Sequence, residues 1–196
     1  MSDPLFDAGD DAATPLDPEE RRQLIPTYIA TRAQLNEAEQ INITEADIWA
    51  FARTRGVLGE KFLLDLHKRM FGKVWRWAGN LRVTARNIGV EAYKIGPELR
   101  TLLDDVRFWI EHQTYSPDEI AVRFHHRLVW THPFPNGNGR HARMAADLLA
   151  VSLGGGRFTW GSASLVRGDE TRARYVAALR SADNHDIAPL LAFARS

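Results

Sequence analysis

The stretch HPFPNGNGRHAR, residues 132–143, constrains the fold and the chemistry of this 196-residue sequence more than any other. Pro133 must follow the end of a helix, because the residue before a proline is pushed out of helical geometry. Gly137 and Gly139 allow a sharp turn into a second helix, whose first N–H groups have no partners within that helix. The sequence therefore predicts two helices joined by a loop that presents a phosphate-binding helix start.

The side chains of this stretch suit phosphate chemistry. Arg140 and Arg143 are three residues apart, so they share one face of the first helical turn and can each bind phosphate oxygens. His132 precedes the loop and is a candidate general base, because imidazole is largely neutral near pH 7. Two alternatives remain open: Arg143 could form a surface ion pair with Asp147, and the glycines could form only a tight turn.

The rest of the sequence is predicted to be mainly helical. Ser116-Pro-Asp-Glu119 begins the helix before residue 132, because Ser116 can cap it, Pro117 suits its first turn and Glu119 can complete a capping box. Apolar spacing and capping residues predict further helices over 18–30, 31–41, from Thr44 onward, around 62–70, from Pro97 to about 110, near 140–149, and near 169–181 and 186–195.

Residues 80–95 have a different pattern. Leu81-Arg-Val-Thr and Glu91-Ala-Tyr-Lys-Ile alternate apolar and polar side chains, and Asn87-Ile-Gly89 lies between them. This arrangement is typical of a β-hairpin. We therefore expect an all-α, mainly helical domain that carries one small β-hairpin flap.

The composition excludes several classes of protein. The chain has no cysteine, which excludes disulfides, thiolate metal sites and a cysteine nucleophile. It has no apolar run near the roughly 20 residues of a membrane span, and its start does not resemble a secretory signal. We therefore expect a cytoplasmic protein that does not enter a membrane.

Charge is distributed unevenly along the sequence. Residues 1–20 contain seven acidic residues and no Lys or Arg, whereas the remainder has 25 basic residues against 18 acidic ones. The acidic start is expected to be a disordered tail. A basic body attracts phosphates of nucleotides or of nucleic acids, but the sequence has no nucleic-acid recognition motif, so we do not expect a nucleic-acid partner.

The spacing His132-x-Phe-x-x-Gly-Asn-Gly-Arg-x-x-Arg143 resembles the signature of the Fic family. The resemblance extends through about residues 55–195, and Leu66–Arg82 is similar to the segment that precedes the Fic flap. The motif, the Trp-Gly pair at 160–161 and residues 182–193 resemble the Fic subgroup called mobile mystery protein B. With the acidic disordered tail over 1–20, we expect an N-terminal helical segment over 21–54, which is a candidate inhibitory segment, and the resemblance implies a Fic domain over 55–196.

The resemblance implies a helical-bundle Fic fold and transfer of AMP from ATP to a Ser, Thr or Tyr hydroxyl of a target protein. His132 would remove the hydroxyl proton, and Phe134 would anchor the loop. The residues implied to hold the phosphates and to form the catalytic set with His132 are Gly137, Asn138, Gly139, Arg140 and Arg143. The residues implied to align the target along the flap are Ile88, Gly89, Val90, Lys94 and Ile95.

One position of the motif departs from the family. Asn136 stands where the family usually has Asp or Glu, which binds Mg²⁺. An amide oxygen can bind Mg²⁺ but brings no charge, so we expect weaker metal binding. Two alternatives to AMP transfer follow: transfer of another phosphate-containing group, or a weakly catalytic nucleotide-binding regulator.

Regulation and partners are suggested by the resemblance as well. Many Fic proteins carry an inhibitory helix whose Glu pairs with the second motif arginine, here Arg143. Leu35 stands where that Glu would be, but Glu37 and Glu39 are close, so one of them is a candidate inhibitory residue on a helix over 31–41. A plain packing helix is the alternative. The subgroup also suggests a toxin–antitoxin setting, with a small antitoxin-like or DNA-binding partner.

Overall fold

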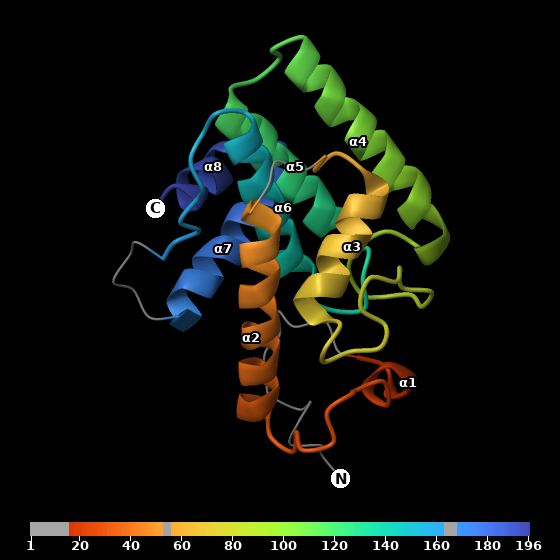
Figure 1. Cartoon of the computed structure of the whole chain (residues 1–196). Helices are drawn as coiled ribbons and strands as arrows, with labels where there is room; N and C mark the ends of the chain where they lie inside the picture. Colours follow the sequence, from red (N-terminus) through yellow and green to blue (C-terminus); the bar gives the residue numbers. More distant parts are fainter. Residues whose placement is uncertain (1–15, 53–55, 163–167) are drawn as a thin grey trace.

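Two helices, α5 (Pro117–Thr131) and α6 (Asn138–Ser152), form the centre of the fold. The computed structural model describes residues 16–52, 56–162 and 168–196. The other elements are α1 (Pro18–Arg21), α2 (Arg32–Phe51), α3 (Glu60–Phe71), the 3-10 turn η1 (Ala92–Lys94), α4 (Ile95–Glu111), α7 (Gly168–Asp183) and α8 (Ala188–Ala194). Helices α4 and α8 pack on α5, while α3 and α2 pack on α6 (Figure 1).

Helix α5 forms where the sequence predicts it. The Ser116 hydroxyl accepts a hydrogen bond from the Glu119 N–H at 3.3 Å, which caps the helix. The Glu119 carboxylate does not complete a capping box but accepts from Arg123 at 2.7 Å. The predicted apolar stripe is buried in the core and consists of Ile120, Phe124 and Leu128. The start of α5 and its buried face are therefore confirmed.

Helix α2 is one continuous helix of 20 residues, so the predicted break near Thr44 was wrong. Thr31 caps it as expected, because its hydroxyl accepts from the Gln34 N–H at 3.2 Å. The Thr44 hydroxyl donates to the Gln40 carbonyl at 3.0 Å, one turn back in the same helix. A threonine that bonds back in this way sits inside a helix without capping it.

Helix α1 is much shorter than the helix predicted over 18–30. Pro26 cannot continue a helix, and the Ile25 N–H donates to the Val74 carbonyl at 2.8 Å instead. Residues 16–20, expected in a disordered tail, are part of the folded body, and Leu16 is buried. Residues 1–15 of that predicted tail and residues 53–55, where the predicted domain boundary falls, lie outside the described residues.

Residues 80–95 form no β-hairpin, so that prediction was wrong. The segment is an irregular loop followed by η1, and Ile95, predicted as a flap residue, is the fully buried first residue of α4. The loop carbonyls of Thr84 and Val90 accept hydrogen bonds from the Arg82 guanidinium. Because the Arg82 side chain satisfies these carbonyls, the loop does not need hairpin pairing to satisfy them. We keep the word flap for residues 83–91.

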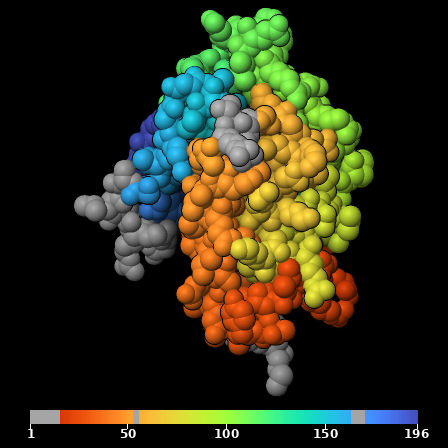
Figure 2. Space-filling view, viewed as in Figure 1, coloured from red at the N-terminus to blue at the C-terminus, as the bar shows by residue number. Residues whose placement is uncertain are grey.

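The surface seen in Figure 2 places α2 across the middle of one face, with α7 on one side of it and α3 on the other. Helix α1 lies at the lower end of this face, next to the loop that follows α3. Among the described residues, no helix combines the length and the apolar character needed to cross a membrane.

Helix α1 is attached to the flap by a buried ion pair. The guanidinium of Arg86 binds both carboxylate oxygens of Glu20 and lies 3.0 Å from the Asp17 carboxylate. The side chains of Arg86 and Glu20 are only 4% and 10% exposed, so the pair is shielded from solvent. The Trp77 indole also donates to the Glu20 carbonyl at 3.3 Å. The N-terminal segment therefore holds one arm of the flap.

We expect Glu20→Ala to destabilise the fold, because it leaves Arg86 buried with a reduced complement of negative charge. Breaking a buried pair costs roughly 3–5 kcal/mol, and Asp17 keeps the expected loss at the lower end of that range. Urea denaturation of the purified protein measures the loss. The matched control is Glu19→Ala, because Glu19 is exposed on the same helix. Equal stability of the two variants would contradict this account of α1.

Candidate active site

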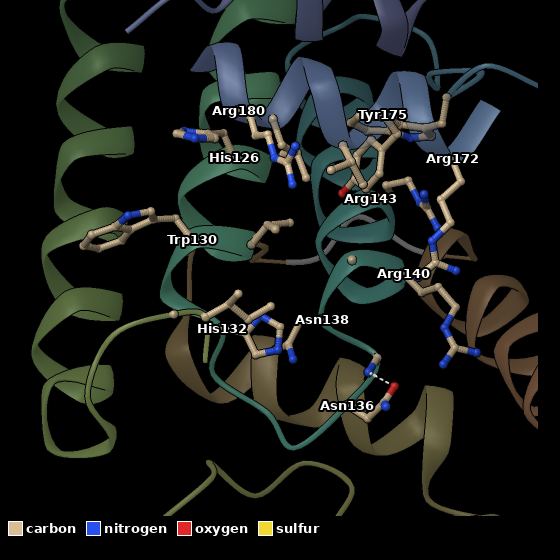
Figure 3. Close-up of a pocket in the computed structure, with 18 of the residues that line it drawn as sticks. His126, Trp130, His132, Asn136, Asn138, Arg140, Arg143, Arg172, Tyr175 and Arg180 are labelled. Atoms are coloured by element: carbon tan, nitrogen blue, oxygen red, sulfur yellow. Dashed lines mark hydrogen bonds between the residues drawn. The ribbon is translucent and has the colours of Figure 1, made fainter. Parts of the chain in front are cut away.

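His132 ends α5 in the left-handed conformation, with φ 53° and ψ 60°. Its N–H donates to the Leu128 carbonyl at 3.1 Å, so the residue still closes the last helical turn. A non-glycine residue rarely adopts this conformation, so the surrounding contacts must hold it there. The turn places the imidazole against the cavity that α6 and α7 also line (Figure 3).

The His132 imidazole is a neutral base in this site. Burial lowers the pKa of His132 to about 4, and the nearby positive charges of Arg82 and Arg86 act in the same direction. The nearby Val129 carbonyl partly offsets this lowering of the His132 pKa by favouring the protonated ring. The ring is therefore unprotonated at pH 7 and able to accept a proton.

Phe134 anchors the loop in the core, as expected from the resemblance. Its ring stacks on the ring of His67 at a centroid distance of 3.6 Å and meets the edge of His141 at 5.0 Å. The His67 Nδ1 accepts from the Gly79 N–H at 2.9 Å, so Nε2 carries the proton and donates to the Asn136 carbonyl at 3.0 Å. Burial holds the pKa of His67 well below its usual value, which keeps this ring neutral.

The Asn138 side chain serves the loop itself. Its Oδ1 accepts from the Phe134 N–H at 2.9 Å, and its Nδ2 donates to the Phe134 carbonyl at 2.8 Å. The residue is buried, with 4% of its surface exposed. Asn138 was predicted to be catalytic and to hold phosphate; its side chain instead braces the loop, which leaves its backbone N–H for an anion.

The two motif glycines have different roles. Gly137 has φ 80°, and a Cβ built there would lie 2.6 Å from the ring of Phe71. Only glycine fits this position without a shift of the ring. Gly139 lies within α6, and a Cβ there would lie 3.6 Å from the Tyr175 hydroxyl, an ordinary contact. The predicted sharp turn therefore depends on Gly137. Gly139 lines the cavity without adding a side chain to it.

Arg140 and Arg143 both line the cavity, as predicted from their spacing. The Arg143 guanidinium lies 5.3 Å from the centre of the Tyr175 ring. The alternative ion pair with Asp147 does not form, because that carboxylate accepts from the Phe158 N–H and the Trp160 indole. Arg143 is therefore available to a ligand in the cavity.

Arg140 contacts α2. Its Nη1 lies 2.6 Å from the Glu39 carboxylate, and the other oxygen of Glu39 accepts from the Trp75 indole at 2.7 Å. We expected Glu37 or Glu39 to reach Arg143; Glu39 instead binds Arg140, and Glu37 is exposed on the surface of α2. The reason is the unbroken α2, which runs beside α3 and α6 and brings Glu39 against the first motif arginine.

The cavity has a volume of about 1030 Å³ and lies between the flap, the loop, α2 and α7. Arginines dominate its polar lining: Arg32, Arg140, Arg143, Arg172 and Arg180. Figure 3 shows Arg140, Arg143 and Arg172 on the same side of the cavity, with Arg180 beside His126 at its far end. The aromatic side chains of Trp160 and Tyr175 line it too. Such a lining suits an anion that also has an aromatic part.

The flap contributes two of its predicted residues to the cavity, Ile88 and Gly89. Gly89 has φ 85°, and a Cβ there would lie 2.4 Å from the Cβ of His132. Val90 is buried, and Lys94 faces a second hollow on the other side of the flap. The flap therefore packs directly on the proposed base.

The residues around Asn136 fit a protein-held Mg²⁺ poorly. The Asn136 side-chain oxygen accepts from the Gly137 N–H at 2.6 Å, so it is turned toward the loop backbone (Figure 3). In the described part of the cavity lining, the one carboxylate is that of Asp183, which binds His126 at the far end. Magnesium sites usually include a carboxylate. We therefore derive no step through a metal ion.

Several residues of the site were not found from the sequence. Arg82, which binds the His132 carbonyl at 2.7 Å, and Glu20, which holds Arg86, come from segments with no chemical motif. Arg172 and Arg180 lie on α7, about two helical turns apart, and both line the cavity. The surplus of basic residues in the body was the single signal for these arginines, and it does not indicate which of them share a cavity.

Comparison with protein families and known proteins gives consistent results. Residues 57–150 match the model of the Fic/DOC family. The protein adenylyltransferase fic-1 of Caenorhabditis elegans is 31% identical over 136 residues, which are 67% of this chain and 25% of that protein. The protein adenylyltransferase Fic of Drosophila melanogaster is 28% identical over 137 residues, which are 68% of this chain and 26% of that protein. The chain thus spans about a quarter of the length of these relatives.

Solved structures share the fold. The N-terminal Fic domain of a Bep effector protein from Bartonella quintana superposes with a TM-score of 0.69 at 17% identity, covering 90% of this chain and 91% of that chain. BepC from Bartonella tribocorum with bound AMPPNP has a TM-score of 0.68 at 19% identity, covering 91% and 97%. Fic-1 from C. elegans has a TM-score of 0.64 at 25% identity, covering 90% of this chain and 51% of that chain.

We expect Gly137→Ala to distort the loop and Gly139→Ala to leave it intact. The first variant must displace the Phe71 ring and strain φ, which costs roughly 1–3 kcal/mol, whereas the second makes an ordinary contact. Thermal unfolding and ATP binding of both variants measure the difference. Equal loss of stability in the two variants would contradict the separate roles assigned to the two glycines.

Proposed function

Because residues 57–150 make this chain a member of the Fic/DOC family, we propose that it is a protein adenylyltransferase, which transfers AMP from ATP to a serine, threonine or tyrosine hydroxyl of a target protein. The observation that carries the proposal is the placement of a neutral histidine, His132, and two arginines, Arg140 and Arg143, on one cavity of nucleotide size. ATP as the donor is supported by the AMPPNP bound to the similar fold of BepC.

In the proposed reaction the target hydroxyl oxygen forms a bond to the α-phosphorus of ATP. The bond between that phosphorus and the oxygen bridging to the β-phosphate breaks, and pyrophosphate leaves. His132 accepts the hydroxyl proton. Negative charge on the bound phosphates favours the protonated imidazole and so helps His132 to accept the hydroxyl proton. The base is thereby stronger in the loaded site than in the empty one.

The arginines and the start of α6 supply the electrostatic part of the reaction. Arg140 and Arg143 bind phosphate oxygens, and the backbone N–H groups at Asn138 and Gly139 point along the positive end of the helix dipole. Phosphoryl transfer depends mainly on such positioning and charge stabilisation. Any Mg²⁺ would be bound chiefly by the nucleotide phosphates, because Asn136 brings no carboxylate. The flap, with Ile88 and Gly89 at the cavity, is the proposed contact with the target.

The same residue, Asn136, favours a second candidate, a nucleotide-binding regulator with little catalysis. Transfer of another phosphate-containing group is the remaining enzymatic alternative. The proposal places the protein in the cytoplasm, where ATP is available. A chain without cysteine forms no disulfides and fits that reducing compartment. A small antitoxin-like or DNA-binding partner belongs to the proposal as a regulator of this activity.

We expect wild-type protein to label host-lysate proteins from α-labelled ATP, and His132→Ala to lose roughly 10²–10⁴-fold in rate, because it removes the base. Parallel reactions with labelled GTP, UTP and CTP identify the donor. The kcat/KM for ATP should fall as the pH drops through about 4, and not near 6.5, because His132 is protonated only below its lowered pKa. Circular dichroism at each pH checks that the protein remains folded. Equal labelling by wild type and His132→Ala would refute both enzymatic readings.

We also propose that Glu39 restrains the empty site by occupying Arg140. The two side chains are 8% and 35% exposed, so their pair is partly shielded, and ATP phosphates must compete with the Glu39 carboxylate for the guanidinium. This differs from the expected pairing with Arg143, and it needs no separate inhibitory helix, since α2 is also a packing helix against α3.

Glu39→Gln tests the restraint, because the amide oxygen can still accept from the Trp75 indole while the negative charge is lost. We expect ATP to bind roughly tenfold more tightly to this variant, which corresponds to about 1.4 kcal/mol. Isothermal titration calorimetry measures the affinity. Glu37→Gln is the matched control, because Glu37 is exposed on the same helix. No gain for Glu39→Gln, or the same gain for Glu37→Gln, would rule the restraint out.

A further inference from the structure

Arg82 is a buried arginine between the flap and the loop. Only 2% of its surface is exposed, and no carboxylate of the described residues lies within ion-pair distance of its guanidinium. Burial lowers the pKa of Arg82, because loss of solvent disfavours the charged guanidinium. Burying a cation without a directly paired carboxylate costs free energy. The hydrogen bonds of Arg82 must offset that cost, and an apolar residue at this position could not form them.

Those hydrogen bonds join three separate backbone segments. The Arg82 Nε donates to the His132 carbonyl at 2.7 Å, Nη1 donates to the Thr84 carbonyl at 2.9 Å, and Nη2 donates to the Val90 carbonyl. The backbone N–H of Arg82 donates to the Pro133 carbonyl at 2.9 Å. One residue therefore connects both arms of the flap to the two peptide units that flank Pro133.

The connection acts at a residue whose backbone conformation is strained. His132 has φ 53°, which a non-glycine residue adopts only when its surroundings hold it. Gly89 of the flap lies against the Cβ of His132, and the Val90 N–H is 3.5 Å from the Thr131 carbonyl. The planar fork of arginine can bind several carbonyls in fixed directions, whereas a lysine ammonium cannot reproduce that geometry.

We propose that Arg82 is a positioning residue for the transfer reaction: it locks the flap to the backbone of His132, so that a target held by the flap presents its hydroxyl to the imidazole. Arg82 does not line the cavity, so it would act through His132 and the flap. The inference rests on the proposed function, because it assigns a role within that reaction. The charged groups facing His132 are Arg82 and Arg86, both from the segment after α3, while α5 supplies the Val129 carbonyl.

The test compares Arg82→Lys, which keeps the charge without the fork, with Arg82→Met, which loses both. We expect kcat for label transfer to fall roughly 10–100-fold in both variants, because a misplacement near 1 Å costs about 10²-fold, with the Kd for ATP changed less than about twofold. Arg76→Met is the control, since Arg76 is exposed in the same segment. Wild-type kcat in Arg82→Lys, or loss of ATP binding in either variant, overturns the proposal.

A second readout does not depend on transfer. NMR titration of the His132 ring, assigned by its absence in His132→Gln, should show a higher pKa in Arg82→Met than in wild type, and hydrogen exchange at the Val90 amide should be faster in both variants. If wild type transfers no label, the proposed function fails, and these two measurements still decide whether Arg82 couples the flap to His132. An unchanged titration and unchanged exchange, or unfolding of both variants, overturns the proposal.

Discussion

The stack of Phe134 on His67 is the contact on which the rest of the site depends. It holds the middle of the loop in the core at a centroid distance of 3.6 Å, and His67 uses both ring nitrogens to bind the backbone at Gly79 and Asn136. Such a neutral ring with both nitrogens satisfied can be buried at little cost. With its middle held, the loop has one end at His132 and the other at the start of α6, so both stand at the same cavity.

Charge in the site is arranged by burial as much as by sequence. The cavity gathers arginines from α2, α6 and α7, while the buried Glu39 is the carboxylate that binds the first motif arginine, Arg140. Burial keeps His132 neutral, and the charges of Arg82 and of Arg86, a residue of the flap, act in the same direction. The positive cavity is suited to bind phosphates, and the neutral base beside it is suited to accept a proton. The proposed transfer uses both functions.

Local chemistry and tertiary contacts differ in how well a sequence reveals them. Ser116 and Thr31 cap helices as predicted, because capping depends on residues three positions apart. The flap was misread because alternating side chains indicate a strand only if the backbone groups pair with another strand, and here Arg82 satisfies them. The partner of Glu39 was also misplaced, because an unbroken α2 was not expected. The Glu39 error involves residues far apart in the chain, whereas the flap error involves an arginine that bonds to its own loop only two and eight residues away.

The sequence by itself determined the mainly helical class, the two helices around residues 132–143, the turn at Gly137 and the identity of the proposed base and phosphate-binding arginines. These follow from spacing, capping and steric rules that act over a few residues. The tertiary structure alone decided that Asn138 braces the loop, that Glu39 meets Arg140, that α1 holds Arg86 and that Arg82 joins the flap to His132. Apart from the Asn138 contact, which spans four residues, these pairings join residues that packing brings together, and packing depends on the whole core at once.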